Sequence, residues 1–269
     1  MLLKASLRWR LTRFAFRLSV AGMFPIRDHN PSGRTPYVTY ALLAANLFVF
    51  LAFLGIQTDE SAIWEFYGNW AIIPARVSSG EGYLTLVSSL FLHAGFMHLA
   101  GNMLFLWIFG DNLEDEMGHL TFLGFYLACG LGAGLIHVAM GPQSTVPTVG
   151  ASGAIAGVMG GYLLLFPKAK VDILIIFIIF FKILPVPAWL MLGLWFGMQL
   201  FGSIGSDPDA GGVAYWAHTG GFIIGAILAL PRLIRLGGIG FWNRTHGHPP
   251  HPHPEYRLVR SNIPRVPRK

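Results

Sequence analysis

Charged residues are scarce in this chain. They make up 12% of its 269 residues, whereas hydrophobic residues make up 54%. Soluble domains usually carry about 25% charged residues, so this composition excludes an ordinary globular protein and indicates a chain that crosses a lipid bilayer.

Cysteine is nearly absent as well. Cys129 is the only one, which excludes a disulfide within the chain, and we interpret it as a small core residue rather than a nucleophile.

Long uncharged runs replace the missing charges. A spanning helix needs about 20 mostly apolar residues, and six runs approach that length. They cover residues 37–55, 94–110, 120–140, 149–167, 187–205 and 213–230. We therefore predict an all-α polytopic membrane protein with six transmembrane helices. A further apolar segment, residues 171–184, contains Asp172 and Lys182. With a length of about 14 residues it is more typical of an interfacial or a re-entrant element than of a span, and both alternatives stay open.

Basic residues are concentrated at the two ends of the chain. Cytoplasmic segments of membrane proteins carry an excess of Lys and Arg, so we predict that both termini are cytoplasmic, which requires an even number of spans. Lys168, Lys170 and Lys182 then fall in one inside loop, and Arg76 alone lies outside. The net charge of +6 accordingly reflects membrane topology and anionic lipid headgroups rather than nucleic acid.

Three parts of the chain can be distinguished. Residues 1–36 form a basic cytoplasmic N-terminal segment, residues 37–231 the helical domain, and residues 232–269 a basic tail rich in His and Pro, which we expect to be disordered. The first 20 residues alternate Arg with apolar residues. They fit an amphipathic helix on the inner leaflet or a transit peptide, and a third alternative is that translation begins at Met23.

A serine and a histidine stand inside apolar runs, where polar side chains are costly and usually functional. Ser152 lies at the start of the fourth run and His218 near the start of the sixth. Small residues at four-residue spacing give each helix a flat face. These are Gly153, Gly157 and Gly161 on the fourth, and Ala217, Gly221 and Gly225 on the sixth. Close packing of the two faces would bring His218 to Ser152, where it could accept the hydroxyl proton of a serine nucleophile.

Each of these residues also has a simpler explanation. A serine between glycines in a membrane helix is more often a packing residue bonded to its own backbone, and a lone histidine can simply bond a neighbouring helix. The occurrence of both at one depth on glycine-faced helices favours catalysis.

The second run carries two more polar residues on one helical face. His98 and Asn102 are four residues apart, and both side chains can donate a hydrogen bond to a developing oxyanion. A site in which His93, His98 and His218 bind a metal is the competing hypothesis. We disfavour it because His93 and His98 are five residues apart, which turns them away from each other.

Together these motifs resemble those of the rhomboid intramembrane serine proteases. The resemblance covers about residues 36–231 and rests on His93, His98, Asn102, the glycine-flanked Ser152, and Ala217-His218 followed by Gly221 and Gly225. It implies a six-helix rhomboid bundle in which Ser152 is the nucleophile and His218 the base, without an acidic third member. It further implies an oxyanion hole made by His98, Asn102 and the backbone N–H of Ser152, and no metal or cofactor.

Two positions depart from the family pattern. Many relatives carry Trp-Arg where this chain has Leu84-Thr85, which leaves the anchoring of the first outer loop open. Some members have an aromatic residue at the position of Ala156, so we predict that His218 lacks an aromatic ring to stack on. Residues 166–171 are most similar to bacterial members, which implies a bacterial plasma membrane.

The implied function is an endopeptidase that cleaves in or beside the transmembrane helices of other membrane proteins. A catalytically inactive rhomboid-like protein that binds membrane clients is the alternative, although such members have generally lost the serine or the histidine. A transporter with broken helices is a third hypothesis. It is disfavoured because no inverted repeat is visible and the polar residues cluster near the outer face.

Overall fold

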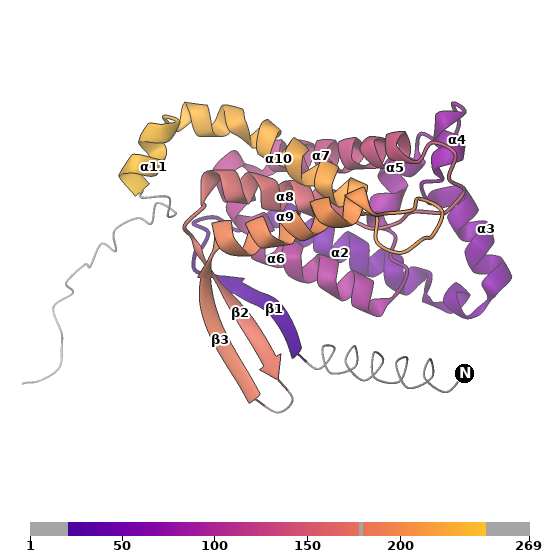
Figure 1. Cartoon of the computed structure of the whole chain (residues 1–269), viewed down its shortest axis with the longest axis horizontal. Coiled ribbons are helices and arrows are strands. Elements are labelled where there is room, and N and C mark those ends of the chain that lie inside the picture. The colour runs from indigo at the N-terminus through magenta and orange to yellow at the C-terminus, as the bar shows by residue number, and fades with distance from the viewer. Residues whose placement is uncertain (1–20, 178–179, 246–269) are drawn as a thin grey trace, which may run out of the picture.

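The computed structural model describes residues 21–177 and 180–245. Apolar helices form a bundle in which they run side by side (Figure 1). They are α2 (Tyr37–Ala52), α6 (Phe96–Met117), α7 (His119–Met140), α8 (Ser152–Leu165), α9 (Ala188–Ile204) and α10 (Tyr215–Arg235). Each coincides with one of the six apolar runs, although α6 and α10 continue beyond the ends of theirs, so the predicted helical membrane bundle is confirmed.

The helices of the bundle differ in whether their length and composition suffice to cross a membrane. Helices α7 and α10 are each long and apolar enough to cross a membrane, and α6 joins them if it is taken together with the bent segment Thr85–Phe91, which meets it at 93°. Helices α2, α8 and α9 are apolar but shorter. Nearly every residue of α8 is buried, so this short helix forms the centre of the bundle and has neighbours on all sides.

Helices α8 and α10 pack closely because glycines face each other. A Cβ atom at Gly221 would overlap the carbonyl oxygen of Gly153, and one at Gly225 would overlap that of Gly157. The predicted flat faces therefore meet. Gly161 faces Phe125 and Leu113 as well as α10, so its side of α8 also contacts α6 and α7.

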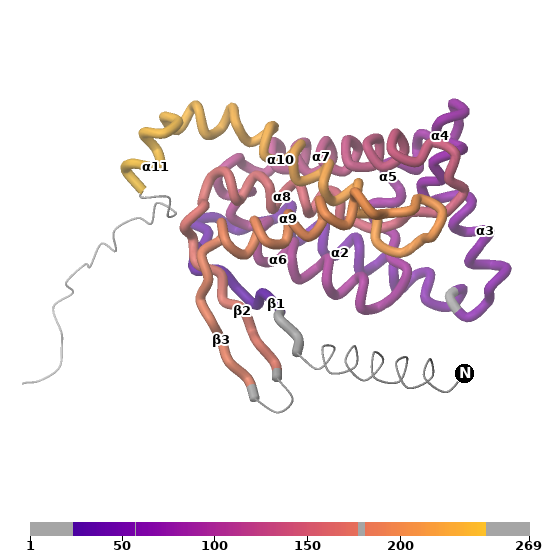
Figure 2. Tube along the Cα trace, viewed as in Figure 1, coloured from indigo at the N-terminus to yellow at the C-terminus, as the bar shows by residue number. Residues whose placement is uncertain are grey.

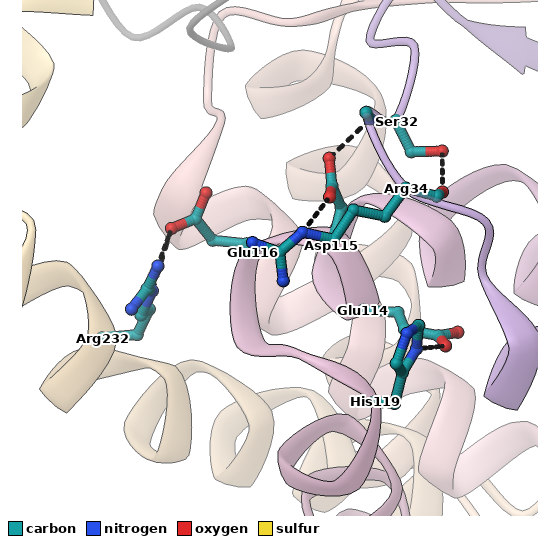
Figure 3. A network of polar contacts seen from close by, with 8 residues as sticks. Ser32, Arg34, Glu114, Asp115, Glu116, His119 and Arg232 are labelled. Carbon is teal, nitrogen blue, oxygen red and sulfur yellow. Dashed lines mark hydrogen bonds and ion pairs between the residues drawn. The ribbon is translucent and has the colours of Figure 1, made fainter.

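A cluster of acidic residues at the end of α6 ties three helices together (Figure 3). The buried Glu114 carboxylate accepts hydrogen bonds from the backbone N–H groups of Val38 and Thr39, at 2.8 and 2.7 Å, and from the Thr39 hydroxyl. It therefore caps the first turn of α2, where backbone N–H groups lack helical partners. Glu116 pairs with Arg232 of α10 at 2.7 Å.

A small antiparallel sheet accompanies the bundle. Its strands are β1 (Ala21–Asp28), β2 (Lys170–Phe177) and β3 (Phe180–Pro187), in that order. The segment predicted as interfacial or re-entrant is therefore a β-hairpin, as its run of Ile and Phe favours. Figure 2 shows the sheet and α11 at the same end of the bundle.

Polar contacts fix the base of the sheet. The Asp172 carboxylate accepts a hydrogen bond from Arg27 at 2.7 Å and lies 2.8 Å from Nε2 of His29, which joins β1 to β2. The hydroxyl of Tyr162 in α8 donates to Asp28 at 2.7 Å. Burial raises the pKa of Asp28 to about 7, although this hydrogen bond acts in the opposite direction.

The loop after α2 folds into short helices at the other end of the bundle. They are η1 (Leu54–Thr58), α3 (Glu60–Trp70), α4 (Pro74–Ser78), α5 (Thr85–Ser88) and η2 (Ser89–Phe91). The guanidinium of Arg76 donates to the carbonyl of Gly68, and the hydroxyl of Thr85 donates to the carbonyl of Gly82 at 2.6 Å. Arg76 thus links α4 to α3 and supplies an anchor for this loop.

The C-terminal end of the helical domain differs from the expected boundary at residue 231. Helix α10 continues to Arg235 and is followed by α11 (Ile239–Thr245). Phe241 is buried, and the indole of Trp242 donates to the carbonyl of Leu164 at 3.1 Å, so α11 packs on the end of α8. Residues 246–269 and 1–20, which include most of the expected tail and the predicted amphipathic helix or transit peptide, lie outside the described residues.

Candidate active site

Ser152 is the first residue of α8, so the N-terminal end of that helix faces the site. The preceding Gly150 has a φ of 134°, a conformation that side chains other than glycine rarely adopt. A Cβ atom at Gly150 would lie 2.8 Å from Nε2 of His98. Glycine therefore serves two purposes here. It permits the turn into α8 and leaves room for the imidazole of His98 beside the serine.

The structure brings Ser152 and His218 together. Nε2 of His218 lies 2.8 Å from Oγ of Ser152, which is within hydrogen-bond distance. This contact follows from the glycine packing of α8 against α10. Gly153, which follows Ser152 directly, and Gly221, three residues after His218, allow the two helix backbones to touch beside the pair. The arrangement suits proton transfer from a serine hydroxyl to a neutral imidazole.

Two residues of α9 support the imidazole of His218, and the sequence analysis missed both. The Gln199 side-chain oxygen lies 2.9 Å from Nδ1 of His218. The ring of Trp195 lies 5.9 Å from that of His218, inclined by 33°, so the prediction that no aromatic ring would lie against His218 is wrong. A polar residue within an apolar run was the signal that could have identified Gln199.

Asn102 lines the same site from α6. It is buried, and its Nδ2 atom has no hydrogen-bond partner among the described residues. Buried polar groups are nearly always hydrogen-bonded, so an unpaired amide beside a cavity is suited to bind an incoming oxygen atom. His98 lies one helical turn earlier on the same face and lines the same cavity.

The cavity has a volume of about 590 Å³, a size typical of ligand-binding sites. Its wall includes His98, Asn102, Ser152, Trp195 and His218, so the four predicted site residues all line it. The loops at residues 141–151 and 205–214 border it, at the end of the bundle where α8 begins. A polypeptide could therefore reach the serine from that end.

The other histidines take separate positions. The rings of His93 and His98 lie 5.0 Å apart, edge to face, but His93 does not line the cavity. His137, which the sequence analysis did not consider, lines the cavity and lies 2.9 Å from the hydroxyl of Thr148. Across residues 21–177 and 180–245, no three His, Cys, Asp or Glu side chains are placed to hold a metal ion.

Comparison with known proteins identifies the family of this chain. Residues 80–235 match the model of the Rhomboid domain. The chain belongs to the rhomboid family.

Several rhomboid proteins are similar to the chain over most of its helical domain. Rhomboid protein 1, mitochondrial, of Saccharomyces cerevisiae is 30% identical over 186 residues, which are 65% of this chain and 51% of that protein. Rhomboid protease GluP of Bacillus subtilis is 30% identical over 199 residues, 73% of this chain and 36% of GluP. The chain thus spans about half the length of these relatives or less.

The departures from the rhomboid pattern have structural counterparts. Leu84 is exposed, and the hydroxyl of Thr85 donates a hydrogen bond within the loop after α2, while Arg76 anchors that loop from α4. Ala156 is fully buried inside α8, and the aromatic ring beside His218 comes instead from Trp195 of α9. Neither departure removes a polar group from the cavity.

Proposed function

We propose that this rhomboid protein is an intramembrane serine endopeptidase that hydrolyses peptide bonds in or next to transmembrane helices of membrane proteins. The observation that carries the proposal is the 2.8 Å contact between Oγ of Ser152 and Nε2 of His218 at the wall of the cavity of about 590 Å³. The similarity to the protein named Rhomboid protease GluP supports the same reaction class.

The first half of the reaction forms an acyl-enzyme. Nε2 of His218 accepts the hydroxyl proton while Oγ of Ser152 attacks the carbonyl carbon of the substrate. The carbonyl oxygen becomes an oxyanion, which accepts hydrogen bonds from the side chains of Asn102 and His98 and from the backbone N–H of Ser152. The protonated His218 then gives its proton to the leaving amine, and the C–N bond breaks.

The second half releases the other product. A water molecule that enters from the loop end gives a proton to His218 and attacks the ester carbonyl. Collapse of the second oxyanion breaks the bond to Ser152, which recovers its proton from His218. A substrate helix must unwind before its carbonyl becomes accessible, so helix-breaking residues near the cleaved bond should favour cleavage.

The alternative is an inactive rhomboid protein that binds membrane clients. Hydrogen-bonded Ser152 and His218, together with the unpaired Asn102 amide, favour catalysis over this alternative because client binding alone requires none of the three.

A chemical test distinguishes the two functions. Purified protein should cleave a single-span substrate and react with a fluorophosphonate probe, and Ser152→Ala should lose both properties while it stays folded. Ser203→Ala is a matched control. Ser203 is a buried serine whose hydroxyl lies 2.9 Å from that of Thr219, and it does not line the cavity. Cleavage by a folded Ser152→Ala protein would exclude the serine mechanism.

We further propose that the protein resides in a bacterial plasma membrane with both termini in the cytoplasm. The basic residues at both ends support this orientation. Single cysteines at Ser78 and Ser206 should react with an impermeant thiol reagent in intact cells, whereas a cysteine at Ser261 should not. Labelling at Ser261 in sealed cells would reverse the orientation.

A further inference from the structure

The three-stranded sheet exposes apolar side chains in the half that extends away from the bundle. Phe24 and Phe181 are 46% and 69% exposed, and Ile183 is 53% exposed. Soluble surfaces rarely gather large apolar side chains in this way. A partner must therefore cover this part of the sheet.

The strand register places the apolar side chains on one face. Phe24 is opposite Leu174, which is opposite Ile183, and Ile176 is opposite Phe181. Directly opposed residues project to the same side, and alternate residues along a strand share a face. The row Phe24, Leu174 and Ile183 and the pair Ile176 and Phe181 thus form the distal part of one face, here called the apolar face. The charged residues of the same face, Lys170 and Asp172, lie at the base of the sheet, next to the bundle.

One basic residue projects from the opposite face of the distal half. Lys182 is exposed and is opposite Ile175, so it projects away from the apolar face. Lys168 is exposed just before β2 and Lys170 at its first residue, and Arg27 is exposed at the base of β1. The distal half of the sheet is therefore apolar, with Lys182 on the face that also exposes Leu184, and the other basic residues lie at its base.

The position of the sheet relative to the bundle indicates what covers it. Figure 1 shows that the strands leave one end of the bundle and run obliquely to the helix axes rather than continuing them. Trp189, 53% exposed, follows β3 at the start of α9, and exposed tryptophans at helix ends are typical of the membrane–water interface. The sheet therefore continues the lipid-facing surface of α9 at interface level.

The sheet cannot enter the hydrocarbon fully. Strands β1 and β3 are its two edges, and unpaired backbone groups at a sheet edge are too costly in hydrocarbon. At the boundary between headgroups and acyl chains, by contrast, water and headgroups can bind both edges while the apolar face is buried. Lys182 then lies among anionic headgroups, which attract basic residues near a membrane surface.

We propose that strands β1–β3 form an interfacial element that inserts its apolar face into the bilayer leaflet opposite the end at which Ser152 lies. The acyl chains cover Phe24, Phe181 and Ile183, and anionic headgroups bind Lys182, Lys168 and Lys170. The element anchors the α8–α9 connection, and it does so whether or not the protein is a protease.

Spin labels measure the depth of each face. The full chain with a nitroxide at Phe181→Cys, Ile183→Cys or Lys182→Cys is reconstituted into nanodiscs of phosphatidylethanolamine and phosphatidylglycerol. Collision rates with oxygen, which concentrates among acyl chains, and with a water-soluble nickel chelate are then compared. Leu194→Cys on the exposed surface of α9 is the lipid reference, and Asp209→Cys in an exposed loop is the water reference.

The expected result is an oxygen-to-nickel ratio at Phe181 and Ile183 close to that at Leu194 and several-fold above that at Asp209. Lys182 should give a lower ratio, nearer to the water reference. Phe24→Cys reports the same face from β1 if a β3 variant does not fold. Ratios at Phe181, Ile183 and Phe24 equal to that at Asp209 would overturn the proposal, as would strong dipolar coupling between Phe181 labels, since it would indicate that a second copy covers the sheet.

Discussion

The side-chain oxygen of Gln199 accepts a hydrogen bond from Nδ1 of His218, 2.9 Å away. Nδ1 is the ring nitrogen that points away from Ser152. An amide oxygen can only accept, so Nδ1 carries the proton and Nε2 is left as the acceptor for the Ser152 hydroxyl, 2.8 Å away. A neutral amide thus occupies the position at which many serine hydrolases place a carboxylate. It fixes the imidazole tautomer without placing a charge inside the membrane.

Replacement of Gln199 should therefore lower the turnover number and leave substrate binding intact. Gln199→Leu removes the acceptor, and the loss of about 1 kcal/mol for one net hydrogen bond corresponds to a decrease in kcat of about 5- to 10-fold. KM should stay unchanged because Gln199 does not line the cavity. Gln199→Glu retains an oxygen acceptor and should recover part of the activity. Parental kcat in a folded Gln199→Leu protein would contradict the positioning role.

Asn102→Ala should slow cleavage by about 10²–10³ if the amide donates one hydrogen bond to the oxyanion. Its unpaired Nδ2 predicts little loss of stability, because no existing hydrogen bond is broken. Asn46→Ala is the matched control, since the Asn46 amide donates to the carbonyl of Leu42 at 2.8 Å within α2. The control should lose stability but keep its kcat. Initial rates and thermal unfolding measure the two effects. An Asn102→Ala protein that lost stability but kept its kcat would rule out the oxyanion role of Asn102.

Gly225→Ala should destabilise the bundle by about 1–3 kcal/mol, the usual effect of overpacking, because the added Cβ would overlap the backbone of Gly157. Gly197→Ala in α9 is the matched control, since nothing lies within 4 Å of its added Cβ, and alanine favours a helix. Thermal unfolding in detergent should show a lower midpoint for Gly225→Ala alone. Equal midpoints would mean that α8 and α10 are less closely packed than described.

Asp28 should make stability depend on pH. Its pKa is raised from 3.8 to about 7 in the folded protein, mainly by burial, so the folded state binds a proton more tightly than the unfolded state does. The contribution of Asp28 to stability is therefore greatest below about pH 4, falls as the pH rises towards 7, and is constant above that.

The corresponding measurement compares the parent protein with Asp28→Asn. The parent should inactivate faster on heating at pH 8 than at pH 5, and Asp28→Asn, which keeps an oxygen acceptor for Tyr162, should show a smaller difference. Since Asp111 also raises the pKa of Asp28, Asp111→Asn should lower the pH at which the change occurs. An unchanged pH profile in Asp28→Asn would assign the dependence to other groups.

The sequence by itself determined the helical bundle and four of the polar residues that line the cavity, namely His98, Asn102, Ser152 and His218. Uncharged runs of sufficient length must become membrane helices, because backbone groups in lipid need internal partners. Glycine spacing in α8 and α10 likewise required a close contact, which the backbones of Gly153 and Gly221 make. Ser152 and His218 could be paired on that basis before their separation was known.

Only the tertiary structure decided which other residues meet these helices. Gln199 and Trp195 are neighbours of His218 because of the rotation of α9, which apolar periodicity does not determine in a helix surrounded by lipid and protein. The pairing of β1 with β2 joins segments separated by more than 140 residues. Strand pairing across such a distance depends on where the intervening helices place the two chain segments, and no local property of residues 21–28 or 170–187 contains that information.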